Sequence, residues 1–174
     1  MNLKNNLKSN YFSYALYSVF FTALLFLIFG YNGWGPAAEN EQTIGEISRW
    51  CERVSGGFFR EPANTLGNLG FVFTGLYMFY KLSNDATNNK EPMFGSFKIA
   101  LVYAAASTFL GPGSMAMHGT HTKFGAWLDN VSMISYILVL LFSLSYRSTR
   151  QVCNLSLKHY LTMHQIWYGY HASP

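Results

Sequence analysis

Four apolar runs separated by polar connections constrain the fold of this 174-residue chain more than any other feature. The runs cover residues 11–31, 62–80, 99–117 and 131–146. A helix that crosses a membrane needs roughly twenty apolar residues to span about 30 Å of hydrocarbon. Only 11% of the residues are charged, whereas soluble domains have about 25%. The sequence therefore predicts an all-α, polytopic membrane helix bundle with four transmembrane helices.

The runs and connections divide the chain into four parts. These are an N-terminal transmembrane helix within 1–31, a polar loop at 32–60, a group of membrane helices at 61–147 and a polar tail at 148–174. Inside the polar loop, residues 44–54 have the pattern of a short amphipathic helix lying at the membrane interface. A cleaved signal peptide is the alternative reading of the first run, because small residues follow it at 35–38. Its apolar core, however, is longer than the roughly 7–15 residues of a signal sequence.

The distribution of Lys and Arg predicts the orientation of the bundle. If the N-terminus is cytoplasmic, the inner side holds twice as many Lys and Arg as the outer side. Such an excess is typical of cytoplasmic loops, so we expect a multi-pass protein with both termini inside. The net charge of +4 forms no basic patch interleaved with stacking aromatics, so nucleic acid is not an expected partner.

This topology brings polar residues from distant parts of the chain to one level of the membrane. Glu61 begins the second run, Ser114 and His118 end the third, and Asp129 precedes the fourth. All four fall at the outer end of the predicted bundle. Polar groups at this depth are costly and usually line a site.

The side chains at this level suit metal-assisted hydrolysis. Ser114 and His118 are four residues apart and share one helix face. Neutral imidazole is a common zinc ligand, a carboxylate such as Asp129 can act as general base, and a hydroxyl can stabilise an oxyanion. His121 would be a second ligand only if the helix continues that far.

Each of these residues also has a purely structural interpretation. A serine in a membrane helix often bonds the carbonyl four residues before it, which is the alternative role of Ser114. His118 would then cap a helix end, and Asp129 and Glu61 would be acids of a first helical turn. His121 by itself is interpreted as structural.

Taken together, four segments resemble the alkaline ceramidase family, within the larger group that includes the adiponectin and progestin membrane receptors. The segments are WCE at 50–52, EPANTLGN at 61–68, GSMAMH at 113–118 and LDNVSM at 128–133. They occur in the family's order and at its approximate spacing, and the similarity covers Trp50 to Arg147. A serine four residues before a histidine, followed about eleven residues later by aspartate, is the family's own pattern.

The resemblance implies a seven-helix membrane bundle that hydrolyses the amide bond of ceramide-like lipids with zinc and a metal-bound water. His118 would match a zinc ligand, and Ser114 and Asp129 would match the residues beside that water. Three further residues would match part of a calcium site: Trp50, Glu52 and Glu61. Arg49 stands where the family has an acidic residue and Val54 where it has asparagine, so we do not expect tight calcium binding.

The chain also departs from the family pattern. The family's two further zinc histidines form an H-x-x-x-H pair on its last helix, whereas His164 and His171 are seven apart. We therefore expect a partial version of the bundle, truncated or frameshifted near Leu161, that carries the front half of the site. The alternatives are a non-catalytic, receptor-like or structural membrane protein of the same fold, or an inert fragment.

Overall fold

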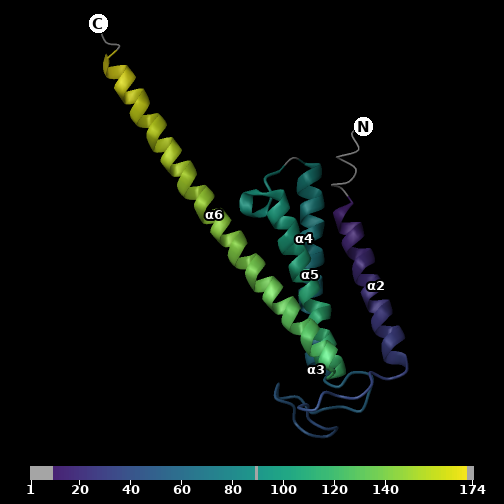
Figure 1. Cartoon of the computed structure of the whole chain (residues 1–174). Coiled ribbons are helices and arrows are strands. Elements are labelled where there is room, and N and C mark those ends of the chain that lie inside the picture. The colour runs from purple at the N-terminus through teal and green to yellow at the C-terminus, as the bar shows by residue number, and fades with distance from the viewer. Residues whose placement is uncertain (1–9, 89, 172–174) are drawn as a thin grey trace.

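The computed structural model describes residues 10–88 and 90–171, with side-chain environments up to residue 156. Within this part the chain is helical, and its only β-type pairing is one isolated bridge. Four of its helices are long, and Figure 1 shows that the loop after the first of them lies at one end of the bundle. The predicted all-α bundle is therefore confirmed. Its elements are α2 (Tyr11–Tyr31), α3 (Pro62–Gly67), α4 (Leu69–Thr87), the 3-10 turn η1 (Met93–Gly95), α5 (Phe97–Thr120) and α6 (Lys123–His171).

Helix α5 is the central element of the bundle. In its most apolar stretch 61% of the residues are buried, compared with 6% in α2 and 11% in α6. Small residues along α5 allow neighbouring helices to approach closely. A side chain at Gly111 would overlap Val72 of α4, and one at Gly113 would overlap Ser132 of α6. Helix α5 is thus held between α4 and α6 by contacts that leave no room for a β-carbon.

Three helices in the described part are long and apolar enough to cross a membrane: Tyr11–Tyr31, Phe97–Thr120 and the Lys123–Ser156 part of α6. The first matches the predicted run residue for residue. The large apolar side chains of α2 are mostly exposed, as expected for a helix whose surroundings are hydrocarbon. Helix α4 (19 residues) packs against both α2 and α5 and is long enough, but it is not apolar enough to count among them. The prediction of four such helices is therefore corrected to three in the described part of the chain.

The second predicted run is divided into two helices. Asn68 separates α3 from α4, and the glycines at 67 and 70 on either side lower the helix propensity there. Helix α4 then continues beyond the predicted end at residue 80, through Lys81 and Asp85, to Thr87. These charged residues lower the hydropathy of α4, which explains why it is not among the helices apolar enough to cross a membrane.

The predicted interfacial helix at 44–54 is wrong. The segment forms turns around an antiparallel bridge between Ile47 and Arg53. Cys51 has a φ of 63°, which is outside the helical region, and the hydroxyl of Ser48 accepts hydrogen bonds from the backbone N–H groups of Trp50 and Glu52. Side chain-to-backbone bonds of this kind compete with helix formation.

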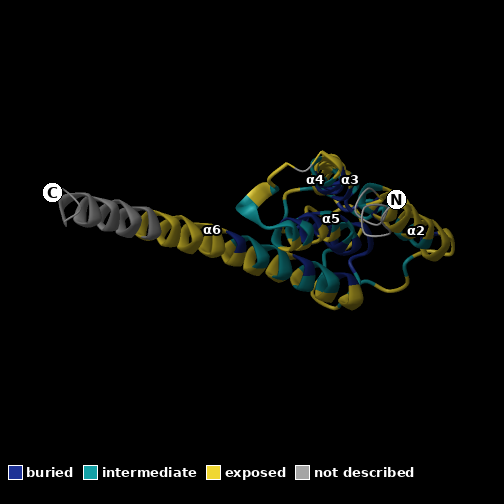
Figure 2. Ribbon diagram, turned by 90° about the horizontal axis from the view of Figure 1, so that it is seen from above, coloured by how far each residue is buried: buried dark blue, intermediate teal, exposed yellow. Residues whose placement is uncertain are grey.

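Helix α6 is longer than predicted. It begins at Lys123 rather than near residue 131 and continues to His171 as one helix of 49 residues. The segment from 148 to 171, expected as a polar tail separate from the membrane helices, is therefore a continuation of α6. Figures 1 and 2 show α6 packed on α5 near its start and then diverging from the bundle, where its described surface is exposed.

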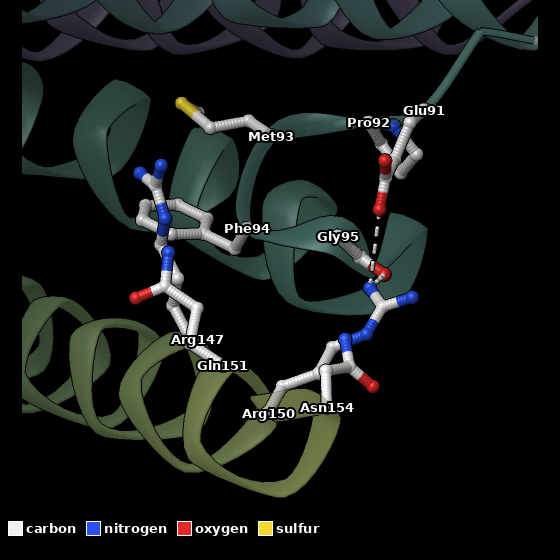
Figure 3. Close-up of a pocket in the computed structure, with 9 residues that line it drawn as sticks. All are labelled: Glu91, Pro92, Met93, Phe94, Gly95, Arg147, Arg150, Gln151 and Asn154. Atoms are coloured by element: carbon white, nitrogen blue, oxygen red, sulfur yellow. Dashed lines mark hydrogen bonds and ion pairs between the residues drawn. The ribbon is translucent and has the colours of Figure 1, made fainter. Parts of the chain in front are cut away.

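A second contact holds α6 to the far end of the bundle, near η1. The guanidinium of Arg150 lies 3.4 Å from Oε1 of Glu91 and donates to the carbonyl of Gly95. Figure 3 shows this pair across a hollow that Arg147 also lines. None of the predicted site residues lies at this end.

Candidate functional site

The loop after α2 docks onto the C-terminal end of α5 through the backbone. The last carbonyls of a helix have no partner inside the helix, and here loop N–H groups supply partners. The N–H groups of Glu61, Arg60 and Ala38 donate to the carbonyls of His118, Gly119 and His121, at 3.0, 2.9 and 2.8 Å. This docking places Glu61 directly over the end of α5, although it is 57 residues before His118.

The carboxylate of Glu61 lies between two imidazoles. Its Oε2 is 2.7 Å from Nδ1 of His118, and its Oε1 is 3.0 Å from Nε2 of His121. The side-chain amide of Asn64 donates to the same Oε2 at 2.9 Å. Glu61 and His121 are fully buried, and the side chain of His118 is 12% exposed. The centre of the site is therefore a buried acid with a histidine on each oxygen.

This environment favours the ionised form of Glu61. Burial by itself would raise the pKa of the carboxyl, but hydrogen bonds from Ser48, Asn64 and His118 and the proximity of the His118 ring hold the pKa below its ordinary value of 4.5. An ionised carboxylate only accepts hydrogen bonds. Nδ1 of His118 and Nε2 of His121 must therefore both be donors, and a neutral His118 has its lone pair on Nε2.

His121 belongs to the Glu61 cluster, although its sequence position favoured a purely structural interpretation. Helix α5 ends at Thr120, and His121 follows in the left-handed conformation with a φ of 54°. Its Nε2 faces Glu61, so it does not extend the helix face of His118 as a neighbouring ligand. Its Nδ1 lies 3.9 Å from Oε2 of Glu41, and neither atom has a hydrogen-bond partner. In the sequence, only its spacing of three residues from His118 pointed to a role for His121. That spacing did not indicate its contact with Glu61.

Ser114 and Asp129 lie where α5 and α6 touch. An ideal β-carbon on Gly113, next to Ser114, would meet the carbonyl of Leu128, next to Asp129, at 3.3 Å. Ser114 is 9% exposed, and Oδ1 of Asp129 is buried without a hydrogen-bond partner. Among the described residues, no hydrogen bond joins either side chain to the Glu61 cluster. The structure thus brings the two helical turns together and leaves both polar groups unengaged.

The three residues predicted for calcium lie together but already have protein partners. Both oxygens of Glu52 accept backbone N–H groups of α3, from Ala63 and Asn64 at 2.8 Å. The carbonyl of Trp50 accepts from the Asn64 amide at 3.5 Å, and the Glu61 oxygens face imidazoles. Calcium requires six to eight oxygen ligands. This arrangement has no free carboxylate oxygens that converge, so it does not fit a calcium ion.

The fit to zinc is limited to one ligand. A histidine that binds zinc usually donates its other ring N–H to a carboxylate, which is the arrangement of His118 and Glu61. The indole of Trp50 packs edge-on against the His118 ring, with centroids 4.9 Å apart. However, no three His, Cys, Asp or Glu side chains in the part of the chain whose surroundings are described are grouped to hold a metal. His164 and His171 lie outside that part.

An apolar cavity of about 530 Å³ opens near the same end of the bundle. It lies between α2 and the turn that joins α5 to α6, and its walls include Phe26, Trp34 and Leu128. None of the predicted site residues lines it, although Leu128 precedes Asp129. The cavity is on the side of α5 that carries Ala116 and Thr120, away from the face of His118.

Comparison with known families gives one match. A family model described as ceramidase matches residues 47–174, which is most of the chain. The match begins three residues before Trp50 and extends well beyond Arg147, so it is wider than the region that carried the resemblance in sequence. It leaves α2 outside. No curated protein and no solved structure matches the chain.

Proposed function

The chain belongs to the ceramidase family, whose members are membrane enzymes that hydrolyse ceramide, and we propose that its own activity is zinc-dependent cleavage of the amide bond of a ceramide-like lipid. The observation that supports the zinc site is the 2.7 Å contact between Glu61 Oε2 and His118 Nδ1. It fixes the tautomer in which Nε2 of His118 is free to bind a metal. The remaining ligands would come from groups outside the described side chains.

Each residue of the proposed site has one task. His118 holds the metal, and Glu61 keeps the His118 ring in position. Asp129 accepts a proton from the attacking water and then delivers it to the leaving amine, and the buried, unpartnered Oδ1 is suited to this task. The hydroxyl of Ser114 donates to the oxygen that becomes negative in the transition state. When bound, zinc would supply Lewis-acid polarisation and would lower the pKa of water.

Zinc content and hydrolysis, measured on the same preparations, test this proposal. The chain, reconstituted in lipid nanodiscs, should retain zinc and release fatty acid and sphingoid base from ceramide, both quantified by mass spectrometry. His118→Ala should lose the zinc. Asp129→Asn should keep the zinc and lose about 10²–10⁴-fold in rate, whereas Asn130→Ala, the neighbouring exposed position, should not change the rate.

The proposed role of Ser114 is tested by comparing two serine-to-alanine variants. Ser107 lies two turns before Ser114 on the same face of α5 and is also buried. Ser114→Ala should lower the rate about 10²–10³-fold, and Ser107→Ala should leave it within a small factor of wild type. Equal effects of the two substitutions would reduce Ser114 to a packing role.

A non-catalytic, receptor-like or structural protein of the same fold is the second candidate. The observation that favours it is the lack of a three-residue metal group among the side chains whose surroundings are described. Such a protein would bind ceramide in nanodiscs without hydrolysis and would carry no stoichiometric zinc. Zinc that persists in His118→Ala would also support this second candidate, because the metal would then be adventitious.

A further inference from the structure

Among the residues whose surroundings are described, His121 is the most fully enclosed ionisable residue that the proposed mechanism does not use. Its side chain has no exposed surface, and it sits in a left-handed conformation that non-glycine residues rarely adopt. Its backbone and its ring both contact the docked loop, through the Ala38 N–H and through the carboxylate of Glu61. A buried residue held in such a conformation by several partners is worth testing for a specific role.

The main chain of Glu61 is held at both polar groups, and its carbonyl accepts hydrogen bonds from the N–H and the hydroxyl of Thr65. Its N–H donates to the carbonyl of His118, which holds the main chain, but its side chain has further rotatable bonds. Asn64 and His118 engage Oε2. Ser48 also hydrogen-bonds the carboxyl group. His121 engages Oε1 at 3.0 Å, on the oxygen opposite His118, and so helps to fix the plane in which the carboxylate lies.

The plane of the carboxylate decides which nitrogen of His118 carries the proton. When Oε2 stays 2.7 Å from Nδ1, the proton is on Nδ1 and the lone pair is on Nε2. If the carboxylate turns away, the proton is no longer held at Nδ1 and both tautomers become populated. A hydrogen bond at one ring nitrogen sets the state of the other.

We propose that His121 is a positioning residue for His118, acting through Glu61. It donates from Nε2 to Oε1, locks the carboxylate, and thereby keeps Nε2 of His118 available to a metal ion. The role rests on the proposed function only in assigning a metal to His118. The His121 imidazole also engages the Glu61 oxygen that would otherwise be open to a cation.

Two amide substitutions of different length provide the test. In Gln the side-chain nitrogen lies about where Nε2 of histidine lies, so His121→Gln keeps a donor to Glu61. In Asn the nitrogen corresponds to Nδ1, so His121→Asn cannot reach Oε1. Asn also tolerates the left-handed conformation, which makes it the milder change for folding. A difference between the two variants therefore reports the loss of the hydrogen bond to Glu61 and not the replacement of an imidazole by an amide.

The first measurement needs neither zinc nor activity. Solid-state ¹⁵N spectra of histidine-labelled protein in bilayers, with metal removed, report the tautomer of His118, which is assigned by its disappearance in His118→Ala. Wild type and His121→Gln should show a single His118 tautomer protonated at Nδ1. His121→Asn should show a mixture. A single, unchanged Nδ1–H signal in folded His121→Asn would overturn the proposal.

The second measurement is the zinc dissociation constant, obtained by competition with a chelator. Loss of a residue that orients a ligand typically costs about 10–100-fold in metal affinity. His121→Asn should weaken zinc by this factor, and His121→Gln should stay close to wild type. If His121→Asn does not fold, His121→Gln decides: a mixed tautomer in that folded variant would overturn the proposal. If wild type binds no zinc, the proposed function fails while the tautomer comparison still decides the role of His121.

Discussion

Oε2 of Glu61 lies 2.7 Å from Nδ1 of His118, so an acid at the start of one helix is joined to an imidazole at the end of another. The contact depends on the loop that docks onto α5 and buries Glu61 completely. At the end of α5, Nδ1 of His118 is therefore the hydrogen-bond donor and Glu61 is the acceptor. Four predictions follow from this contact and from the packing around it.

Replacing Glu61 by Gln should weaken zinc binding about 10–100-fold. Gln presents an amide N–H₂ to one of the two imidazoles, where a donor then faces a donor, and the tautomer of His118 is no longer fixed. The zinc dissociation constant of the reconstituted protein measures the effect. Glu46→Gln is the control, because Glu46 lies in the same loop, is exposed, and has a carboxylate that accepts only the Thr43 N–H. Equal affinities in the two variants would contradict the orienting role of Glu61.

Acid should destabilise the protein through Glu61. Its pKa in the folded protein lies below the ordinary value of 4.5, so its stabilising contribution is complete above about pH 4.5 and is lost as the pH falls through the lower, folded-state pKa. Thermal unfolding followed from neutral pH down to about pH 3 should show a decrease in Tm that is smaller in Glu61→Gln. A variant that follows the wild-type pH profile throughout would assign the acid sensitivity to other groups.

Glu52 should contribute to stability as a helix cap. Its two oxygens accept N–H groups in the first turn of α3, where a negative charge is also favoured by the helix dipole. Glu52→Ala should lower the free energy of unfolding by about 0.5–2 kcal/mol. Glu39→Ala should have little effect, because the Glu39–Lys123 ion pair is highly exposed and such pairs contribute little. Denaturant titration in mild detergent compares the two, and similar losses would refute the capping role.

The helical fold was largely predictable because hydrocarbon imposes a strong constraint on sequence. The run at 11–31 has no charged residue, and its helix matches the prediction at both ends. The helix pair α5 and α6 was also expected, although its ends were not. The structure extends α5 to Thr120 and starts α6 at Lys123, because the tight turn between them needs only two residues and a left-handed His121.

The site was only partly predictable because its central contact connects distant segments. Spacing along one helix relates Ser114 to His118, but no local pattern relates either to Glu61. That contact exists because loop N–H groups bind the last carbonyls of α5. The loop was expected to contain a helix at 44–54. Cys51 has a left-handed backbone conformation that is incompatible with this helix, and the composition of the segment does not indicate that conformation.

The close contact of α5 with α6 gives the last prediction. A side chain at Gly113 would overlap Ser132 and crowd the carbonyl of Leu128, and both residues lie within one turn of Asp129 on α6. Gly113→Ala must therefore push α6 away from α5 and should cost about 1–3 kcal/mol of stability. Gly67→Ala in α3 is the matched control, because nothing lies within 4 Å of its β-carbon position and alanine favours the helix. The control should be neutral or slightly stabilising.

The same substitution should also lower the hydrolysis rate. Since the displacement of α6 moves Asp129 away from the Ser114 turn, the rate of Gly113→Ala should fall even at temperatures where the variant remains folded. A full rate in a destabilised Gly113→Ala would separate the helix contact from catalysis and would place the base elsewhere than Asp129.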